Sequence, residues 1–120
     1  MGRATRILIV DDDPLMRFAL GQTLSDSGCE VAEAADGAAA TRALAVSPNR
    51  FDVVLLDDLM PDSRDLQLLT RLRSLSPSSR VIMMTAHPTP ALVAGATQEG
   101  AVCVLNKPID FDELCRLVTP

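Results

Sequence analysis

Three continuous apolar runs of strand length constrain the fold of this chain more than any other feature of its sequence. They are Arg6 to Val10, Asp52 to Leu56 and Arg80 to Thr85. A strand with one face in water alternates apolar and polar residues, whereas a continuous run is typical of a strand covered on both faces, as in parallel sheets. Two further runs, Cys29 to Ala35 and Ala101 to Leu105, bring the predicted strands to five.

Helix signals fill the gaps between these runs. Asp13 followed by Pro14 predicts an N-cap with proline at the first helical position. This helix is expected to end at Gly28 and to carry an apolar face of Leu15, Phe18, Ala19 and Leu24. The other predicted helices are Gly37 to Val46, Leu66 to Leu75, Ala91 to Glu99 and Asp110 to Val118.

The pattern predicts one α/β domain over residues 1–120, with (βα)5 topology. Because crossovers between parallel strands are right-handed, the helices should cover both faces of the sheet, and five strands favour the flavodoxin-like order 2-1-3-4-5. The last helix is followed almost at once by the end of the sequence, so we expect the chain to be cut at its C-terminus from a longer protein.

Charge and composition argue against several kinds of partner. The 11 Lys and Arg residues are outnumbered by 16 Asp and Glu, and no basic run is present, so direct binding to nucleic acid is not expected. The three cysteines form no Cys-x-x-Cys pair, which argues against a zinc site and a disulfide framework. Apolar runs stay far below the roughly 20 residues that cross a bilayer. We therefore expect a cytoplasmic protein that does not bind membranes.

Polar residues follow the predicted strands at the edge where open α/β sheets bind ligands. They are Asp11, Asp12 and Asp13 after the first strand, Asp57 and Asp58 after the third, Thr85 at the end of the fourth and Lys107 after the fifth. Strands one and three are neighbours in the predicted order, so their carboxylates should converge and select Mg²⁺. A carboxylate nucleophile with a lysine and a hydroxyl suits phosphoryl transfer. Glycine-rich nucleotide-binding motifs are missing, so we do not expect the chain to bind a nucleotide. The phosphoryl group must therefore come from a separate donor molecule.

These segments resemble the CheY-like receiver domain of bacterial two-component response regulators over essentially the whole chain. The matching segments are Ile9-Val10-Asp11-Asp12-Asp13, Leu56-Asp57-Asp58-Leu59-Met60-Pro61, Met84-Thr85-Ala86 and Lys107-Pro108. Thr85-Ala86-His87 and Gln98-Glu99-Gly100-Ala101 are also similar to receivers of sigma-54 activators of the nitrogen-regulator type.

The resemblance implies a role for each matching residue. Asp57 would accept the phosphoryl group, and Mg²⁺ would be held by Asp11, Asp12, Asp57 and the backbone carbonyl of Leu59. Thr85 would be the switch hydroxyl and Lys107 would pair with the phosphate, followed by a proline that is often cis in this family. The implied protein is a signalling switch and not an enzyme with a separate substrate. Its implied partners are a histidine kinase or phosphotransfer protein, a C-terminal output domain, and a second copy on activation.

Three departures from the family pattern affect this interpretation. Val104 replaces the usual aromatic residue three positions before the lysine, so signal output could differ in detail. Arg64-Asp65 replaces the usual Asp-Gly, which could reshape the loop into the third helix. Asp58 adds charge beside Asp57, although strand alternation should point it to the opposite side, where its effect could be nil.

Two of the polar residues have simpler structural explanations, and two other functions also fit the sequence. Asp13 is better explained as an N-cap than as a metal ligand, and the single histidine, His87, as a solvated loop residue with at most a role in dephosphorylation. A phosphorylation-independent pseudo-receiver is one alternative, favoured by Val104. A small aspartyl-phosphate phosphatase is another, with Asp11 as nucleophile and Asp13 as acid.

Overall fold

The fold is a five-stranded parallel sheet between two layers of helices, seen in a computed structural model that describes residues 3–62 and 66–119. The strands are β1 (Arg6–Val10), β2 (Glu30–Ala34), β3 (Val53–Asp57), β4 (Arg80–Thr85) and β5 (Ala101–Asn106). The helices are α1 (Pro14–Asp26), α2 (Gly37–Val46), α3 (Gln67–Leu75), α4 (Pro90–Gln98) and α5 (Phe111–Val118). The strand order is β2-β1-β3-β4-β5, so the predicted topology is confirmed.

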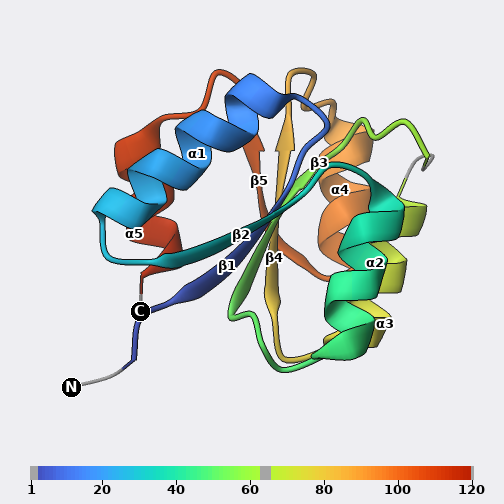
Figure 1. The fold of residues 1–120 in the computed structure, drawn as a ribbon. Helices are drawn as coiled ribbons and strands as arrows, with labels where there is room; N and C mark the ends of the chain where they lie inside the picture. Colours follow the sequence, from blue (N-terminus) through green and yellow to red (C-terminus); the bar gives the residue numbers. More distant parts are fainter. Residues whose placement is uncertain (1–2, 63–65, 120) are drawn as a thin grey trace.

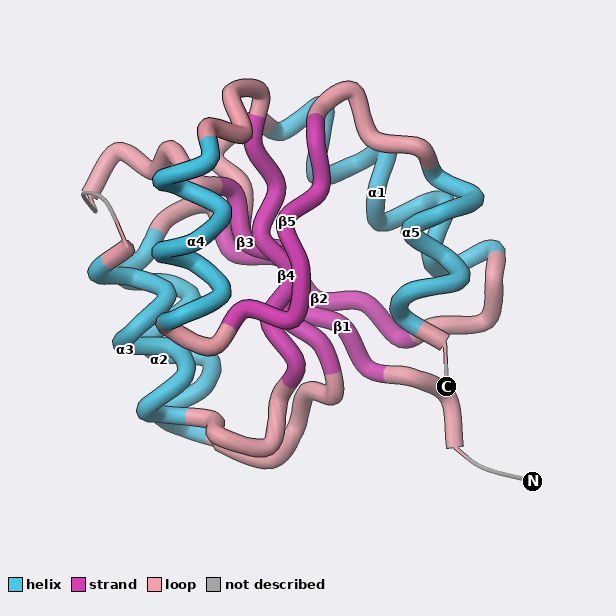
Figure 2. Tube along the Cα trace, turned by 180° about the vertical axis from the view of Figure 1, so that it is seen from behind, coloured by secondary structure: helices cyan, strands magenta, loops and turns pink. Residues whose placement is uncertain are grey.

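Alternate residues of each central strand feed two separate cores. Leu8, Val54 and Met83 pack on the side of α2, α3 and α4, whereas Ile9, Leu55 and Ile82 pack on the side of α1 and α5. Figures 1 and 2 show these two helical layers on opposite sides of the sheet. Burial on both faces explains why the inner positions of these strands are all apolar.

Caps and glycines set the ends of the helices. Asp13 Oδ1 accepts the N–H groups of Leu15 (2.9 Å) and Met16 (3.4 Å), which confirms the predicted N-cap of α1. Gly28 and Gly100 follow α1 and α4 with φ of 92° and 103°, a conformation that favours glycine.

The predicted apolar face of α1 is partly wrong. Leu15 and Phe18 are 79% and 67% exposed, whereas Leu24 is buried as predicted. The helix packs on the sheet through Leu24 together with Leu20 and Gly21. Across residues 3–62 and 66–119, no helix has both the length and the apolar character that a membrane span requires.

Candidate functional site

Three carboxylates meet where β1 and β3 end. Asp11 and Asp12 follow β1, Asp57 closes β3, and the two strands pair in parallel, so their carboxyl ends lie together. One oxygen from each of the three lies within 4.8 Å of the others. Asp11 and Asp57 are buried and Asp12 is exposed. The predicted convergence of these side chains is therefore confirmed.

The Asp11 carboxylate is held firmly by only one of its oxygens. Oδ1 accepts the N–H of Asp13 at 2.9 Å, and the Arg17 guanidinium fixes the Asp11 carbonyl at 2.7 Å. Oδ2 is buried without a hydrogen-bond partner among the residues that the structure describes, and Lys107 Nζ lies 3.8 Å away. Burial, assisted by the charge of Asp57, raises the pKa of Asp11 to about 6.

Asp57 lies beside the ammonium group of Lys107, which follows β5. Lys107 Nζ donates to Asp57 Oδ1 at 3.1 Å, and the Leu59 N–H approaches the same oxygen at 3.5 Å. Burial raises the pKa of Asp57, although the lysine opposes the rise. Burial lowers the pKa of Lys107, but the hydrogen bond and charge of Asp57 outweigh it, so the net pKa of the ammonium is raised. Lys107 thus remains charged beside a carboxylate.

The oxygen-rich cluster fits a hard divalent cation. Carboxylates are the ligands that Mg²⁺ prefers, and it needs only one or two of them beside water and phosphate. The buried Asp11 Oδ2, which lacks a hydrogen bond within the described part of the chain, is an atom that such a cation would satisfy. The donor set of Asp11, Asp12 and Asp57 is therefore suited to Mg²⁺.

Thr85 is fully buried and is hydrogen-bonded on both sides. Its hydroxyl donates to Oδ2 of Asp58 at 2.7 Å and accepts the N–H of His87 at 3.0 Å. The Asp58 carboxylate thus contacts the side chain expected to act as the switch. Strand alternation predicted that Asp58 points away from Asp57, but the partner of Asp58 on β4 has no signal in the sequence.

The remaining predicted residues are placed as follows. The His87 side chain is exposed, and Val104 is half-buried against the core on the α4 side. The Lys107–Pro108 peptide bond is cis, as the resemblance implied. Arg64-Asp65 lie outside the described residues, and the expected ligand role of the Leu59 carbonyl stays a prediction.

All three cysteines are free thiols. Cys29 is buried, and Cys103 and Cys115 are half-buried.

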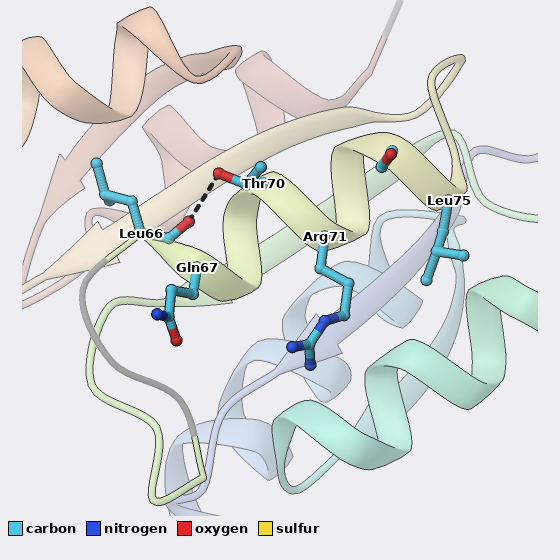
Figure 3. A pocket seen from close by; sticks show the side chains of 6 residues that line it. Leu66, Gln67, Thr70, Arg71 and Leu75 are labelled. Atoms are coloured by element: carbon cyan, nitrogen blue, oxygen red, sulfur yellow. Dashed lines mark hydrogen bonds between the residues drawn. The ribbon is translucent and has the colours of Figure 1, made fainter.

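A separate groove runs along α3 and does not include the acidic cluster. Its lining residues are Leu66, Gln67, Thr70, Arg71, Ser74 and Leu75. Figure 3 shows these side chains along one helix, with the Thr70 hydroxyl donating to the Leu66 carbonyl at 3.1 Å. The candidate chemistry therefore lies at the strand ends and not in this groove.

Comparison with known proteins identifies the family. The model of the response regulator receiver domain matches residues 7–119. The chain belongs to the response regulator receiver family. This receiver domain is similar to the CheY of a CheX–CheY–BeF3–Mg complex from Borrelia burgdorferi, with a TM-score of 0.89, 28% identity, and coverage of 96% of this chain and 87% of the other.

Curated relatives of this receiver domain include transcriptional regulators. It is 38% identical over 115 residues to the DNA-binding transcriptional regulator NtrC of Bradyrhizobium sp. (strain RP501 Parasponia). It is 33% identical over 116 residues to the transcriptional regulatory protein GlrR of Escherichia coli (strain K12). The match covers 96% and 97% of this chain but only 24% and 26% of those proteins, so the chain spans about a quarter of their length. The predicted likeness to nitrogen-regulator receivers is confirmed.

Proposed function

We propose that this receiver domain accepts a phosphoryl group on Asp57 from the phosphohistidine of a histidine kinase or phosphotransfer protein. The observation that carries the proposal is the 3.1 Å contact of Lys107 Nζ with Asp57 inside a three-carboxylate cluster. A carboxylate oxygen of Asp57 attacks phosphorus, the phosphorus–nitrogen bond of the donor breaks, and an acyl phosphate forms. The Lys107 ammonium is in place to pair with the phosphoryl oxygens.

The metal site proposed here consists of Asp11, Asp12, Asp57 and the backbone carbonyl of Leu59. When bound, Mg²⁺ neutralises charge on the phosphoryl oxygens. Asp11 Oδ1 is already held by the Asp13 N–H, so the loop fixes the carboxylate with Oδ2 left for a cation. Asp13 itself caps α1, which argues against its use as the acid of a phosphatase.

The rest of the proposal concerns the longer protein. Similarity to the transcriptional regulators NtrC and GlrR supports an output domain that regulates transcription, which we place C-terminal to this receiver domain. We also propose a homodimer on activation and a cytoplasmic location, as the family resemblance implies. Receiver domains are signalling switches, and the only reactions proposed for this one are its own phosphorylation and dephosphorylation.

Intact-mass measurement tests the proposal. The protein is incubated with Mg²⁺ and acetyl phosphate, and the modified residue is located by peptide mapping. We expect the mass of one phosphoryl group on Asp57, and its loss when Mg²⁺ is removed or when Asp57→Asn is used. Unchanged labelling of Asp57→Asn would refute the assignment of the acceptor, and unlabelled wild-type protein would favour a pseudo-receiver.

A further inference from the structure

The hydrogen bond between Thr85 and Asp58 is a feature that the proposed reaction does not use. The Thr85 side chain is fully buried, and its hydroxyl proton is given to Asp58 Oδ2 at 2.7 Å. A threonine hydroxyl has a single proton to donate. Thr85 therefore cannot donate to Asp58 and to a phosphoryl oxygen on Asp57 at the same time.

The register of the sheet explains why these two residues meet. Asp57 pairs with Met84 across β3 and β4, and the Asp58 N–H continues the ladder to the Met84 carbonyl at 3.0 Å. Asp58 and Thr85 are therefore the next opposed pair, one residue beyond the last paired position. Directly opposed residues of adjacent strands lie on the same face of the sheet, so a short carboxylate can reach the hydroxyl.

We propose that Asp58 is a positioning residue that holds Thr85 in the unphosphorylated conformation of this receiver domain. Phosphorylation must break the Asp58–Thr85 hydrogen bond before Thr85 can donate to the phosphoryl group, so Asp58 sets the threshold for switching. Hydrogen bonds to a carboxylate are roughly twice as strong as those between neutral groups. The inference rests on the proposed function, because it assigns the phosphoryl oxygen as the competing acceptor.

The same hydrogen bonds connect Thr85 to the start of α4. The His87 N–H donates to Thr85 Oγ1 at 3.0 Å, and the His87 carbonyl accepts the Thr89 N–H at 2.9 Å. Thr89 in turn caps α4 through the Leu92 N–H at 3.1 Å. Release of Thr85 from Asp58 thus alters the support of the loop that leads into α4.

A double-mutant cycle tests this role. The affinity for beryllofluoride, a phosphoryl mimic, is measured at saturating Mg²⁺. The proteins compared are the wild type, Asp58→Ala, Asp58→Asn, Thr85→Val, and the double variants that combine each Asp58 substitution with Thr85→Val. A ligand binds more weakly when its competent conformation is sparsely populated. We expect Asp58→Ala to tighten binding by about tenfold when Thr85 is present, the scale of one charged hydrogen bond, and by much less with Val at position 85. Asp58→Asn retains an acceptor oxygen, so its affinity for beryllofluoride should lie between those of the wild type and Asp58→Ala.

The cycle separates a positioning role from simple charge repulsion. Loss of the Asp58 charge alone would tighten anion binding equally with Thr or Val at position 85, and that result would overturn the proposal. NMR gives a second readout: in metal-free Asp58→Ala or Asp58→Asn protein, the Thr85 side-chain shifts should move toward those of the beryllofluoride-bound wild type.

Two failures of this experiment can be told apart. If the wild type binds beryllofluoride and both Asp58 variants bind it with the same affinity, the role of Asp58 is overturned and the proposed function is left intact. A wild-type protein that binds no beryllofluoride would overturn both, because nothing would then compete with Asp58 for the Thr85 proton.

Discussion

Replacement of Asp11 by Asn should stabilise the metal-free receiver domain at neutral pH. Asp11 is fully buried, and burial raises its pKa from 3.8 to about 6. The folded state therefore binds a proton more readily than the unfolded chain, so the charged carboxylate opposes folding at pH 7. Asn has the same shape and no charge, and its oxygen can still accept the Asp13 N–H.

The size of the effect follows from the pKa of Asp11. A rise of about two pKa units corresponds to roughly 3 kcal/mol of unfolding free energy. Asn would lose the attraction between the Asp11 carboxylate and the Lys107 ammonium, which lies 3.8 Å from Asp11 Oδ2. We therefore expect a net gain of about 1 to 3 kcal/mol in the free energy of unfolding. Because the folded pKa exceeds the unfolded value, wild-type stability falls as the pH rises from about 4 to about 6, and the gain in Asp11→Asn should grow over the same interval.

Urea denaturation in EDTA at pH 5 and pH 7.5 measures this gain. Asp13→Asn is the matched control, because Asp13 is exposed on the same loop and Asn also caps helices, so its stability should change by less than about 0.5 kcal/mol. Saturating Mg²⁺ should stabilise the wild type and reduce or reverse the difference. A less stable Asp11→Asn protein at pH 7.5, or a gain that is the same at both pH values, would refute the argument.

Two further substitutions test the site and the backbone. Lys107→Ala should still bind Mg²⁺ in a calorimetric titration but label more slowly with acetyl phosphate, because the cation 3.1 Å from Asp57 is gone; wild-type labelling would contradict this. Gly100→Ala should destabilise the fold by more than about 1 kcal/mol in urea, since φ is 103° and a Cβ would lie 2.6 Å from Arg73 Nε. Gly28→Ala has a similar φ of 92° but open space, so an equal or larger loss there would contradict the steric part of the argument.

Strand order and the acidic cluster were predictable because each depends on a local pattern and a general rule. Continuous apolar runs such as the one that ends at Leu56 require cover on both faces, and right-handed crossovers then leave few topologies. Once β1 and β3 are neighbours, Asp11 and Asp57 must lie at the same edge of the sheet. The position of Lys107 beside Asp57 follows from the same edge, although the 3.1 Å contact depends on side-chain packing.

The buried face of α1 could not be predicted from apolar residues alone. Leu15 and Phe18 have helical spacing with other apolar residues, yet both are exposed, and the sheet is contacted by a stripe that includes Gly21. A Cβ at Gly21 would lie 3.7 Å from Val31 and 3.9 Å from Ile9, so the helix lies close to β1 and β2 here. These are ordinary van der Waals distances, so the buried face of α1 includes a position without a side chain, which a count of large apolar side chains cannot reveal.

The contact between Asp58 and Thr85 depends on sheet register, which the sequence does not encode locally. Strand alternation predicted that Asp58 and Asp57 point to opposite sides, but alternation says nothing about what lies across the gap on the next strand. A shift of β4 by one residue would replace Thr85 with Met84 or Ala86 opposite Asp58, and the hydroxyl would lose its carboxylate. The acidic residue beside the proposed acceptor therefore acquires its partner only through the pairing of Asp57 with Met84. That pairing joins the proposed phosphorylation site to the residue expected to respond to it.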